Sequence, residues 1–207
     1  MKHLAWMLTL VMLLAAPCHY AAAEGFGPDW YELSGDVITI RLPAEADGEW
    51  AYRLSHPELL ELLTCEYDEA AGIYAASFRN FSENAGQVDL RMRNTATGEC
   101  CGVLANVCEG GAAIDGTYVS SENMLTFRIK TNPSTGYAWS CAVSDPSAAQ
   151  PMIESVMDPA QNDMLVGAGA TYILAVSRAE GAGEFRLTLS YGRSWEAVPA
   201  KVYTLDF

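Results

Sequence analysis

The residues with reactive or titratable side chains do not form any of the common catalytic motifs. Beyond residue 23 the sequence has a single histidine, His56, which precedes Pro57 and lies outside any serine or cysteine nucleophile motif. The chain has no nucleophile elbow, no His-Glu-x-x-His and no phosphate-binding loop. Carboxylates are so numerous, at 26, that a chance pair of them indicates nothing. We therefore predict that the protein is not an enzyme and needs no cofactor.

The cysteines are more numerous than the histidines. Cysteines of exported proteins are candidates for disulfides, and the N-terminal segment discussed below predicts export. We therefore expect at least one disulfide among Cys65, Cys100, Cys101 and Cys108. Cys141 has the inward parity of its strand, which favours a buried free thiol. The spacings of the others do not match paired Cys-x-x-Cys clusters, so zinc is the weaker alternative and we predict no metal site. The five cysteines beyond residue 23 are Cys65, Cys100, Cys101, Cys108 and Cys141.

The residues best suited to binding form a short polar loop, Asn132-Pro133-Ser134-Thr135-Gly136, here called the first loop. Pro133 fixes its own φ and biases Asn132 toward an extended backbone. Gly136 permits a positive φ where the chain leaves the loop. A stiff, exposed loop loses little conformational entropy when it binds, so this segment is a candidate recognition element.

Two predicted strands hold this loop. Leu125, Phe127 and Ile129 alternate with polar residues and therefore share one face of a half-buried strand. A second run, Tyr137–Val143, leaves the loop. The loop is thus predicted to connect two strands at one end of a β-structure.

The first loop with Tyr137 resembles the signature loop of the chagasin-type inhibitors of papain-like cysteine peptidases. The glycine-rich run Leu165–Thr171 looks like the family's second loop, and Tyr191–Trp195 looks like its third. The three stretches occur in the family's order and at similar spacing, and the resemblance covers roughly Tyr118–Phe207. Ser194 departs from the family, which usually has proline there.

The resemblance implies an inhibitor whose three loops fill the active-site cleft of a papain-like cysteine peptidase reversibly. Thr135 would lie nearest the catalytic Cys/His pair, the second loop would follow the non-primed side, and Arg193 and Trp195 would hold the primed side. The residues implied to contact the peptidase are Asn132, Pro133, Ser134, Thr135, Gly136, Tyr137, Gly167, Ala168, Gly169, Ala170, Arg193, Ser194 and Trp195.

An internal repeat predicts two modules. Gly72–Met92 aligns without a gap on Gly169–Leu189, at a constant offset of 97 residues. Both segments have the two-residue periodicity of strands. We therefore predict an all-β protein of two tandem immunoglobulin-like β-sandwiches. Residues 24–110 form a divergent first module and residues 111–207 the chagasin-like second module. We also expect the second module to fold alone and the first to be dispensable for inhibition.

The first module lacks the binding motifs of the second. The counterpart of the first loop, Pro43–Glu49, carries three carboxylates in place of Asn-Pro-Ser-Thr, and the counterpart of the third, Asn94–Glu99, has no Arg-x-Trp. Pro57 followed by strong helix formers favours a helical turn or two over Pro57–Leu63. The strands expected in this module are Asp36–Leu42, Trp50–Leu54, Ile73–Phe78, Gln87–Met92 and Val103–Val107.

Met1–Ala23 is predicted to be a cleaved signal peptide, with a short basic start, an apolar run and a small-residue cleavage site. Cys18 allows a lipoprotein as the alternative, but Pro17 precedes it where a small residue is preferred. The mature chain is thus expected to be secreted, periplasmic or on the cell surface. No later stretch is apolar enough to insert into a membrane.

The net charge of −14 makes a basic nucleic-acid-binding surface and attraction to anionic lipid unfavourable. We interpret this charge as a source of solubility outside the cell. The alternative to an inhibitor is a secreted or surface immunoglobulin-like binding or adhesion module that keeps the loops as plain turns. Exposure and co-location of Thr135, Gly169 and Trp195 would favour the inhibitor, whereas a buried Trp195 would favour the alternative.

Overall fold

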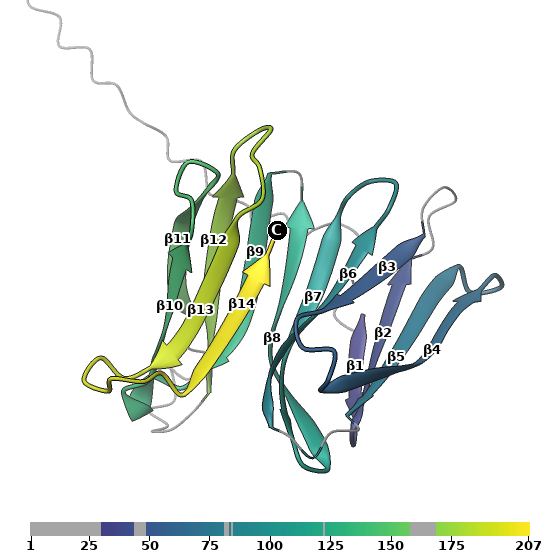
Figure 1. Cartoon of the computed structure of the whole chain (residues 1–207), viewed down its shortest axis with the longest axis horizontal. Coiled ribbons are helices and arrows are strands. Elements are labelled where there is room, and N and C mark those ends of the chain that lie inside the picture. Colours follow the sequence, from purple (N-terminus) through teal and green to yellow (C-terminus); the bar gives the residue numbers. More distant parts are fainter. Residues whose placement is uncertain (1–29, 44–48, 81–82, 84, 122, 158–168) are drawn as a thin grey trace, which may run out of the picture.

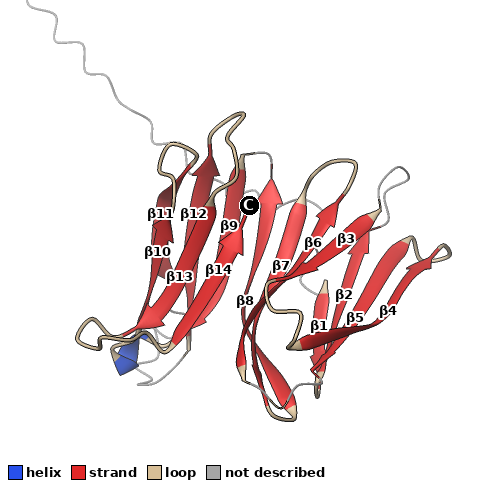
Figure 2. Ribbon diagram, in the orientation of Figure 1, coloured by secondary structure: helices blue, strands red, loops and turns tan. Residues whose placement is uncertain are grey.

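The computed structural model describes residues 30–43, 49–80, 83, 85–121, 123–157 and 169–207. These residues are almost entirely in strands and turns, with one short 3-10 helix at Pro133–Thr135 (Figure 2). The prediction of an all-β protein is therefore confirmed. No helix in this part of the chain is long and apolar enough to cross a membrane. The predicted signal peptide lies outside the described residues.

The described strands follow one another along the chain with short turns between most of them. They are β1 Tyr31–Ser34, β2 Val37–Pro43, β3 Trp50–Leu54, β4 Leu60–Asp68, β5 Ile73–Asn80, β6 Gly86–Asn94, β7 Cys100–Cys108, β8 Gly111–Ser121, β9 Met124–Thr131, β10 Ala138–Val143, β11 Ala149–Met157, β12 Ala170–Arg178, β13 Arg186–Gly192 and β14 Lys201–Asp206.

The strands form three sheets, one of which extends through the whole molecule (Figure 1). This central sheet has the order β11-β12-β9-β8-β7-β6-β3. A four-stranded sheet, β1-β2-β5-β4, and a three-stranded sheet, β10-β13-β14, complete the fold. Each of these smaller sheets packs over one part of the central sheet, which gives two sandwiches.

The strand orders repeat between the two halves of the chain. In the first half, β1-β2-β5-β4 stacks on β3-β6-β7, and in the second half β8-β9-β12-β11 stacks on β10-β13-β14. Each element of the first set has a counterpart at the same place in the second. This is the arrangement expected from the internal sequence repeat, and each half has the seven strands of a small immunoglobulin-like sandwich.

The two sandwiches are joined more closely than a linker would join them. β7 and β8 pair antiparallel from Cys101↔Val119 to Cys108↔Gly111, so the sheet continues across the predicted boundary. Alternate residues of β7 also enter different cores, because successive side chains of a strand point to opposite faces. Cys101 and Val103 pack in the core of the first half, and Cys100 in the core of the second.

A buried polar cluster also spans the junction. From β6, the Arg91 guanidinium donates to the Tyr118 hydroxyl at 2.7 Å and to the Asp89 carboxylate at 3.0 Å, and Tyr118 donates to Asp89 at 2.8 Å. The guanidinium also donates to the Asp206 carbonyl oxygen and lies 3.8 Å from the centre of the Phe207 ring. These contacts connect β6 of the first half to β8 and the C-terminal residues of the second half, and independent folding of the second module stays a prediction.

The expected strands of the first half are all present, but the expected helical turn at Pro57–Leu63 is wrong. β4 begins at Leu60, which pairs with Asn80 of β5. Leu59 and Leu60 are buried in the first core, and this packing outweighs the local helix propensity of the segment. The short strand β1 was not expected either.

The expected disulfide is absent, since all five cysteines are free thiols in the structure. Cys100 and Cys101 point into different cores, and the Cys65 thiol is hydrogen-bonded to the Tyr74 hydroxyl at 2.7 Å. Cys141 was predicted to be a buried free thiol, and in the structure it is a free thiol that is half-buried. Burial raises the pKa of the Cys141 thiol to about 11. None of the described residues form a group of three or more metal-ligating side chains.

Candidate functional site: loops at one end of the second sandwich

The first loop is a single tight turn that its own side chains stiffen. The Thr135 amide donates to the Asn132 carbonyl at 3.2 Å, and the Thr135 hydroxyl donates to the same oxygen at 2.6 Å. The Ser134 hydroxyl donates to the Asn132 side chain at 2.6 Å. Gly136 ends the turn with φ of 75°, which glycine adopts without strain. The residues from Pro133 to Gly136 are exposed, so the loop is both stiff and accessible, as predicted.

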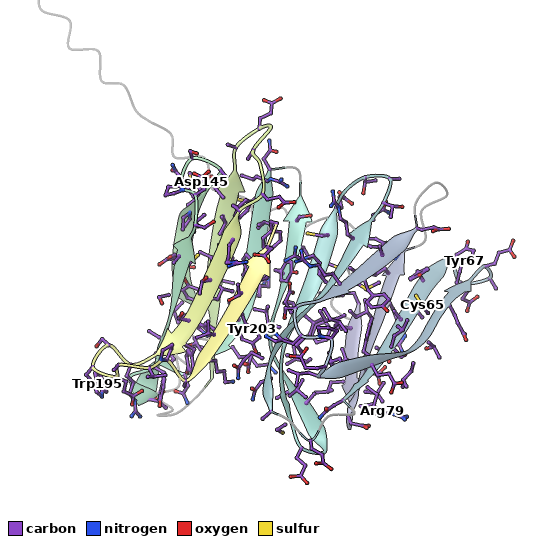
Figure 3. The ribbon with its side chains drawn as sticks, in the orientation of Figure 1. Cys65, Tyr67, Arg79, Asp145, Trp195 and Tyr203 are labelled. Carbon is purple, nitrogen blue, oxygen red and sulfur yellow. The ribbon has the colours of Figure 1, made fainter. Side chains whose placement is uncertain are left out.

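The third loop is also closed by a turn. The Glu196 amide donates to the Arg193 carbonyl at 3.0 Å, so Ser194 occupies the second position of a four-residue turn. The Trp195 side chain is 70% exposed, and it projects from the end of the second sandwich in Figure 3. A large exposed aromatic residue on a closed turn is typical of a binding surface rather than of packing.

Arg193 ties the first and third loops together. Its Nε donates to the Thr135 carbonyl at 3.1 Å, and its Nη1 lies 3.2 Å from the Glu196 carboxylate. Its guanidinium also lies over the Tyr137 ring, 4.3 Å from the centre. Sequence reasoning assigned Arg193 only to contact with a peptidase. The structure gives it a second role, which is to hold the two loops in one arrangement before any partner binds.

The indole of Trp195 lies directly against the first loop. A Cβ atom placed on Gly136 would come within 2.8 Å of the Trp195 ring. Beneath this contact Tyr137 stacks on Tyr191, with 5.2 Å between ring centres, and Trp139 packs on the same Tyr191 at 4.8 Å. The base of both loops is therefore an aromatic layer that continues into the second core, which gives the exposed residues a firm support.

The second loop reaches the same end of the sandwich. Gly167 and Ala168 lie outside the described residues. Gly169 is exposed, and Ala170 begins β12 opposite Thr131, the last residue of β9 before the first loop. Ala170 is buried, so its side chain belongs to the core rather than to an accessible surface. Thr135, Gly169 and Trp195 are thus exposed at one end of the second sandwich, as the inhibitor interpretation required.

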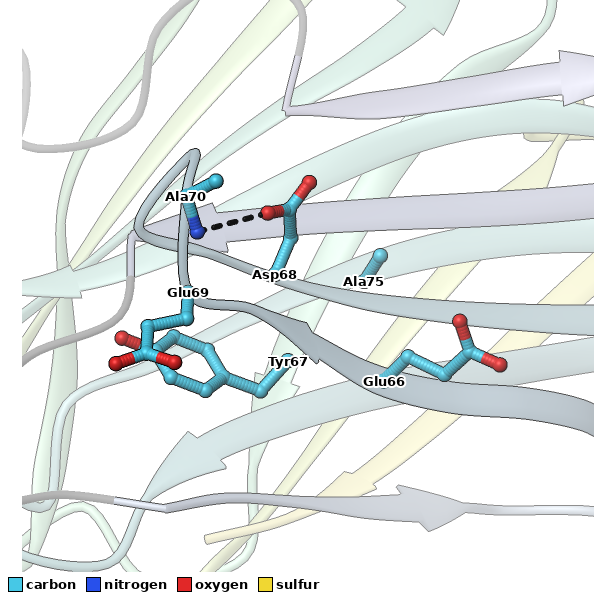
Figure 4. Close-up of a pocket in the computed structure, with 6 residues that line it drawn as sticks. All are labelled: Glu66, Tyr67, Asp68, Glu69, Ala70 and Ala75. Carbon is cyan, nitrogen blue, oxygen red and sulfur yellow. Dashed lines mark hydrogen bonds between the residues drawn. The ribbon is translucent and has the colours of Figure 1, made fainter.

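A separate hollow of about 700 Å³ lies on the first module (Figure 4). Its lining residue Tyr67 is on the opposite side of the molecule from Trp195 in Figure 3. The Asp68 carboxylate in the hollow accepts the amides of Ala70 and Ala71 at 3.0 Å and so shapes the β4–β5 turn. No predicted site residue takes part. The lining residues are Glu66, Tyr67, Asp68, Glu69, Ala70 and Ala75.

Among the comparisons with known proteins, a family model supports the resemblance. The model of the family described as "Chagasin family peptidase inhibitor I42" matches residues 118–207. That family consists of inhibitors rather than enzymes, in agreement with the predicted lack of catalysis. A solved structure of a cysteine protease inhibitor from Entamoeba histolytica is 22% identical, with a TM-score of 0.35, and the match covers 40% of this chain and 75% of that one. No curated protein matches the sequence.

Proposed function

From the match of residues 118–207 to the chagasin family of peptidase inhibitors, we propose that this protein inhibits papain-like cysteine peptidases reversibly. The observation that carries the proposal is the contact between the first and third loops, made by Arg193 and Trp195 at an exposed end of the sandwich. The 70% exposure of Trp195 favours this function over an adhesion module. The predicted leader, Met1–Ala23, would export the inhibitor, so its targets would be peptidases outside the cytoplasm.

The loops would act by occlusion. A papain-like peptidase cuts a bond only when its thiolate reaches the carbonyl carbon in near-attack geometry. The Asn132 carbonyl already accepts two hydrogen bonds inside the loop, which hold the turn in a closed shape that an extended substrate does not have. Trp195 would supply the large apolar contact that fixes the complex. The first loop would thus block the thiolate without being cut.

The direct test is titration of the purified full-length protein against papain and a cathepsin, with a serine peptidase as the control. We expect sub-micromolar, reversible inhibition of the papain-like enzymes only, with the inhibitor recovered uncut. Absence of inhibition at about ten micromolar, by protein shown to be folded, would instead support the adhesion module.

Gly136→Ala should weaken inhibition about tenfold, because it adds backbone strain and a steric clash. An alanine at φ of 75° is strained, and its Cβ would push the Trp195 ring out of its place against the first loop. The measurement is the inhibition constant against papain, together with a melting curve for each protein.

Gly181→Ala is the matched control. Gly181 has nearly the same φ, 68°, but a Cβ there would meet no atom within 4 Å. It lies in the β12–β13 turn, at the far end of β12 from the first loop. Both variants should lose similar stability, while only Gly136→Ala loses affinity. Equal inhibition constants for the two variants would contradict the role given to the Gly136–Trp195 contact.

Ser194→Pro should leave inhibition unchanged or strengthen it by about two- to fivefold. Ser194 is at the second position of the turn closed by Arg193 and Glu196, and proline is favoured there because its fixed φ matches the turn. The inhibition constant of the variant is compared with that of the wild type. Weaker inhibition would mean that the Ser194 amide is needed as a donor in the complex.

A further inference from the structure

The turn between β7 and β8 is held in place by hydrogen bonds from the buried side chain of Asn80. Cys108 and Gly111 pair across it, and Gly110 has φ of 71°. Asn80, only 6% exposed, reaches up from β5 and donates to the carbonyl oxygens of Cys108 and Gly111, at 2.6 and 2.8 Å. The backbone amide of Asn80 donates to the Asp36 carbonyl at 2.9 Å, so Asn80 connects the β1–β2 turn to the β7–β8 turn.

This turn leaves the central sheet at the same end as the first loop. β8 and β9 are neighbours in antiparallel register, with Gly116 opposite Ile129. β9 runs toward this end and passes into the first loop after Thr131, whereas β8 starts from this end at Gly111. Adjacent strands are only about 5 Å apart. In Figure 1 the β7–β8 turn accordingly lies along the lower edge of the molecule, as do the first loop and the β13–β14 connection that carries Trp195.

The three loops alone offer fewer residues than a specific protein–protein interface uses. A specific protein–protein interface takes roughly 20–30 residues from each partner. The residues predicted for the three loops are fewer than that, and one of them, Ala170, is buried. A peptidase seated on the first and third loops would therefore extend beyond them, and the β7–β8 turn is the neighbouring element on the side of the first module.

Charge indicates which peptidases would fit this turn. Residues 24–110 carry five basic and sixteen acidic side chains, a balance of −11, whereas residues 111–207 carry six and ten, a balance of −4. At the turn itself Glu109 is exposed, and no ion pair to it is found among the described residues. A carboxylate on a fixed turn would complement a lysine or arginine on the partner.

We propose that the β7–β8 turn is a fourth contact with the inhibited peptidase, supplied by the junction with the first module and selective for enzymes with a basic rim beside the cleft. This inference rests on the proposed inhibitory function. It also gives the first module a direct part in binding, in place of the expected dispensability.

Glu109→Lys tests the charge of this contact. Against a papain-like peptidase that the wild type inhibits, and that carries lysines or arginines beside its cleft, the variant should inhibit about tenfold more weakly at low salt. The difference should shrink as salt screens the charges. Glu180→Lys is the matched control, since Glu180 is also an exposed residue followed by a positive-φ glycine, in the turn at the opposite end of the second sandwich. It should inhibit as the wild type does.

A bulky label tests the contact independently of charge. Cys108 and Cys65 are both exposed thiols. A polymer-maleimide is attached at Cys108 in the Cys65→Ser protein, and at Cys65 in the Cys108→Ser protein. Only the label at Cys108 should obstruct the peptidase.

The outcomes separate the two proposals. Inhibition by the wild type, together with unchanged inhibition by both Glu109→Lys and the Cys108-labelled protein, would overturn the fourth contact and leave the inhibitor intact. Failure of the unmodified wild type to inhibit any papain-like peptidase would overturn the inhibitory function and, with it, this inference.

Discussion

Arg91→Met is expected to lower the free energy of unfolding by about 3–5 kcal/mol, because it leaves a buried carboxylate without its cation. Asp89 and Arg91 are both nearly inaccessible and lie 3.0 Å apart. Methionine fills much of the same space but cannot donate to Asp89, Tyr118 or the Asp206 carbonyl. Chemical denaturation of the full-length chain measures the loss. Because the cluster joins the two sandwiches, both should unfold at a lower denaturant concentration.

Arg93→Met is the control, since Arg93 lies on the same strand and is exposed. Its effect should stay within about 0.5 kcal/mol. A loss for Arg91→Met no larger than for Arg93→Met would show that the buried cluster does not couple the sandwiches. Adding Asp89→Leu and Tyr118→Phe to Arg91→Met should recover part of the lost stability, because an apolar cluster has no unpaired charge.

The loss should also depend on pH in a defined direction. Burial raises the pKa of the Asp89 carboxyl above its ordinary value of 3.8, while Arg91 opposes that rise. Without Arg91 the folded-state pKa should rise further, so the folded chain would hold a proton that the unfolded chain has released. Stability then falls as pH rises through that window. The gap between Arg91→Met and wild type should therefore be smaller near pH 4 than at about pH 7.

Local patterns predicted best the strands that have one buried and one exposed face. Leu125, Phe127 and Ile129 are buried on β9 as their alternation required. The error at Pro57–Leu63 arose where long-range pairing with β5 outweighed local propensity. The sequence repeat predicts only that the two modules meet at Gly110–Gly111, which is compatible with either a linker or a turn. A glycine pair between alternating apolar runs is equally typical of a hairpin turn, and only the pairing of β7 with β8 decides between the two.

The candidate site was predictable only where its conformation depends on local backbone preferences. The first loop depends on Pro133 and Gly136, whose backbone preferences can be inferred from sequence. The hydrogen bond from Arg193 to Thr135 joins residues 58 apart, and the contact of Trp195 with Gly136 is equally remote. The Asn80 side chain that holds the β7–β8 turn had no sequence signal at all, because a buried asparagine looks the same in sequence as an exposed one.

Trp195→Ala is expected to weaken inhibition of papain-like peptidases by about 30-fold or more, equivalent to about 2 kcal/mol. The indole is 70% exposed in the free protein, so binding would bury most of a large apolar surface that the variant lacks. Its position is already fixed against Gly136 and near the Arg193 guanidinium, so little ordering is lost on binding. The inhibition constant, with separate association and dissociation rates, measures the effect, which should lie mainly in faster dissociation.

Tyr67→Ala is the control for loss of an exposed aromatic side chain. Tyr67 is 58% exposed but lies on β4 of the first module, away from the loops in Figure 3. This variant should inhibit as the wild type does. The double variant Trp195→Ala, Gly136→Ala then tests the loop contact, because a Cβ at Gly136 cannot displace a ring that is absent. The combined loss should be smaller than the sum of the single losses. Strict additivity would mean that Gly136 and Trp195 act in the complex independently of each other.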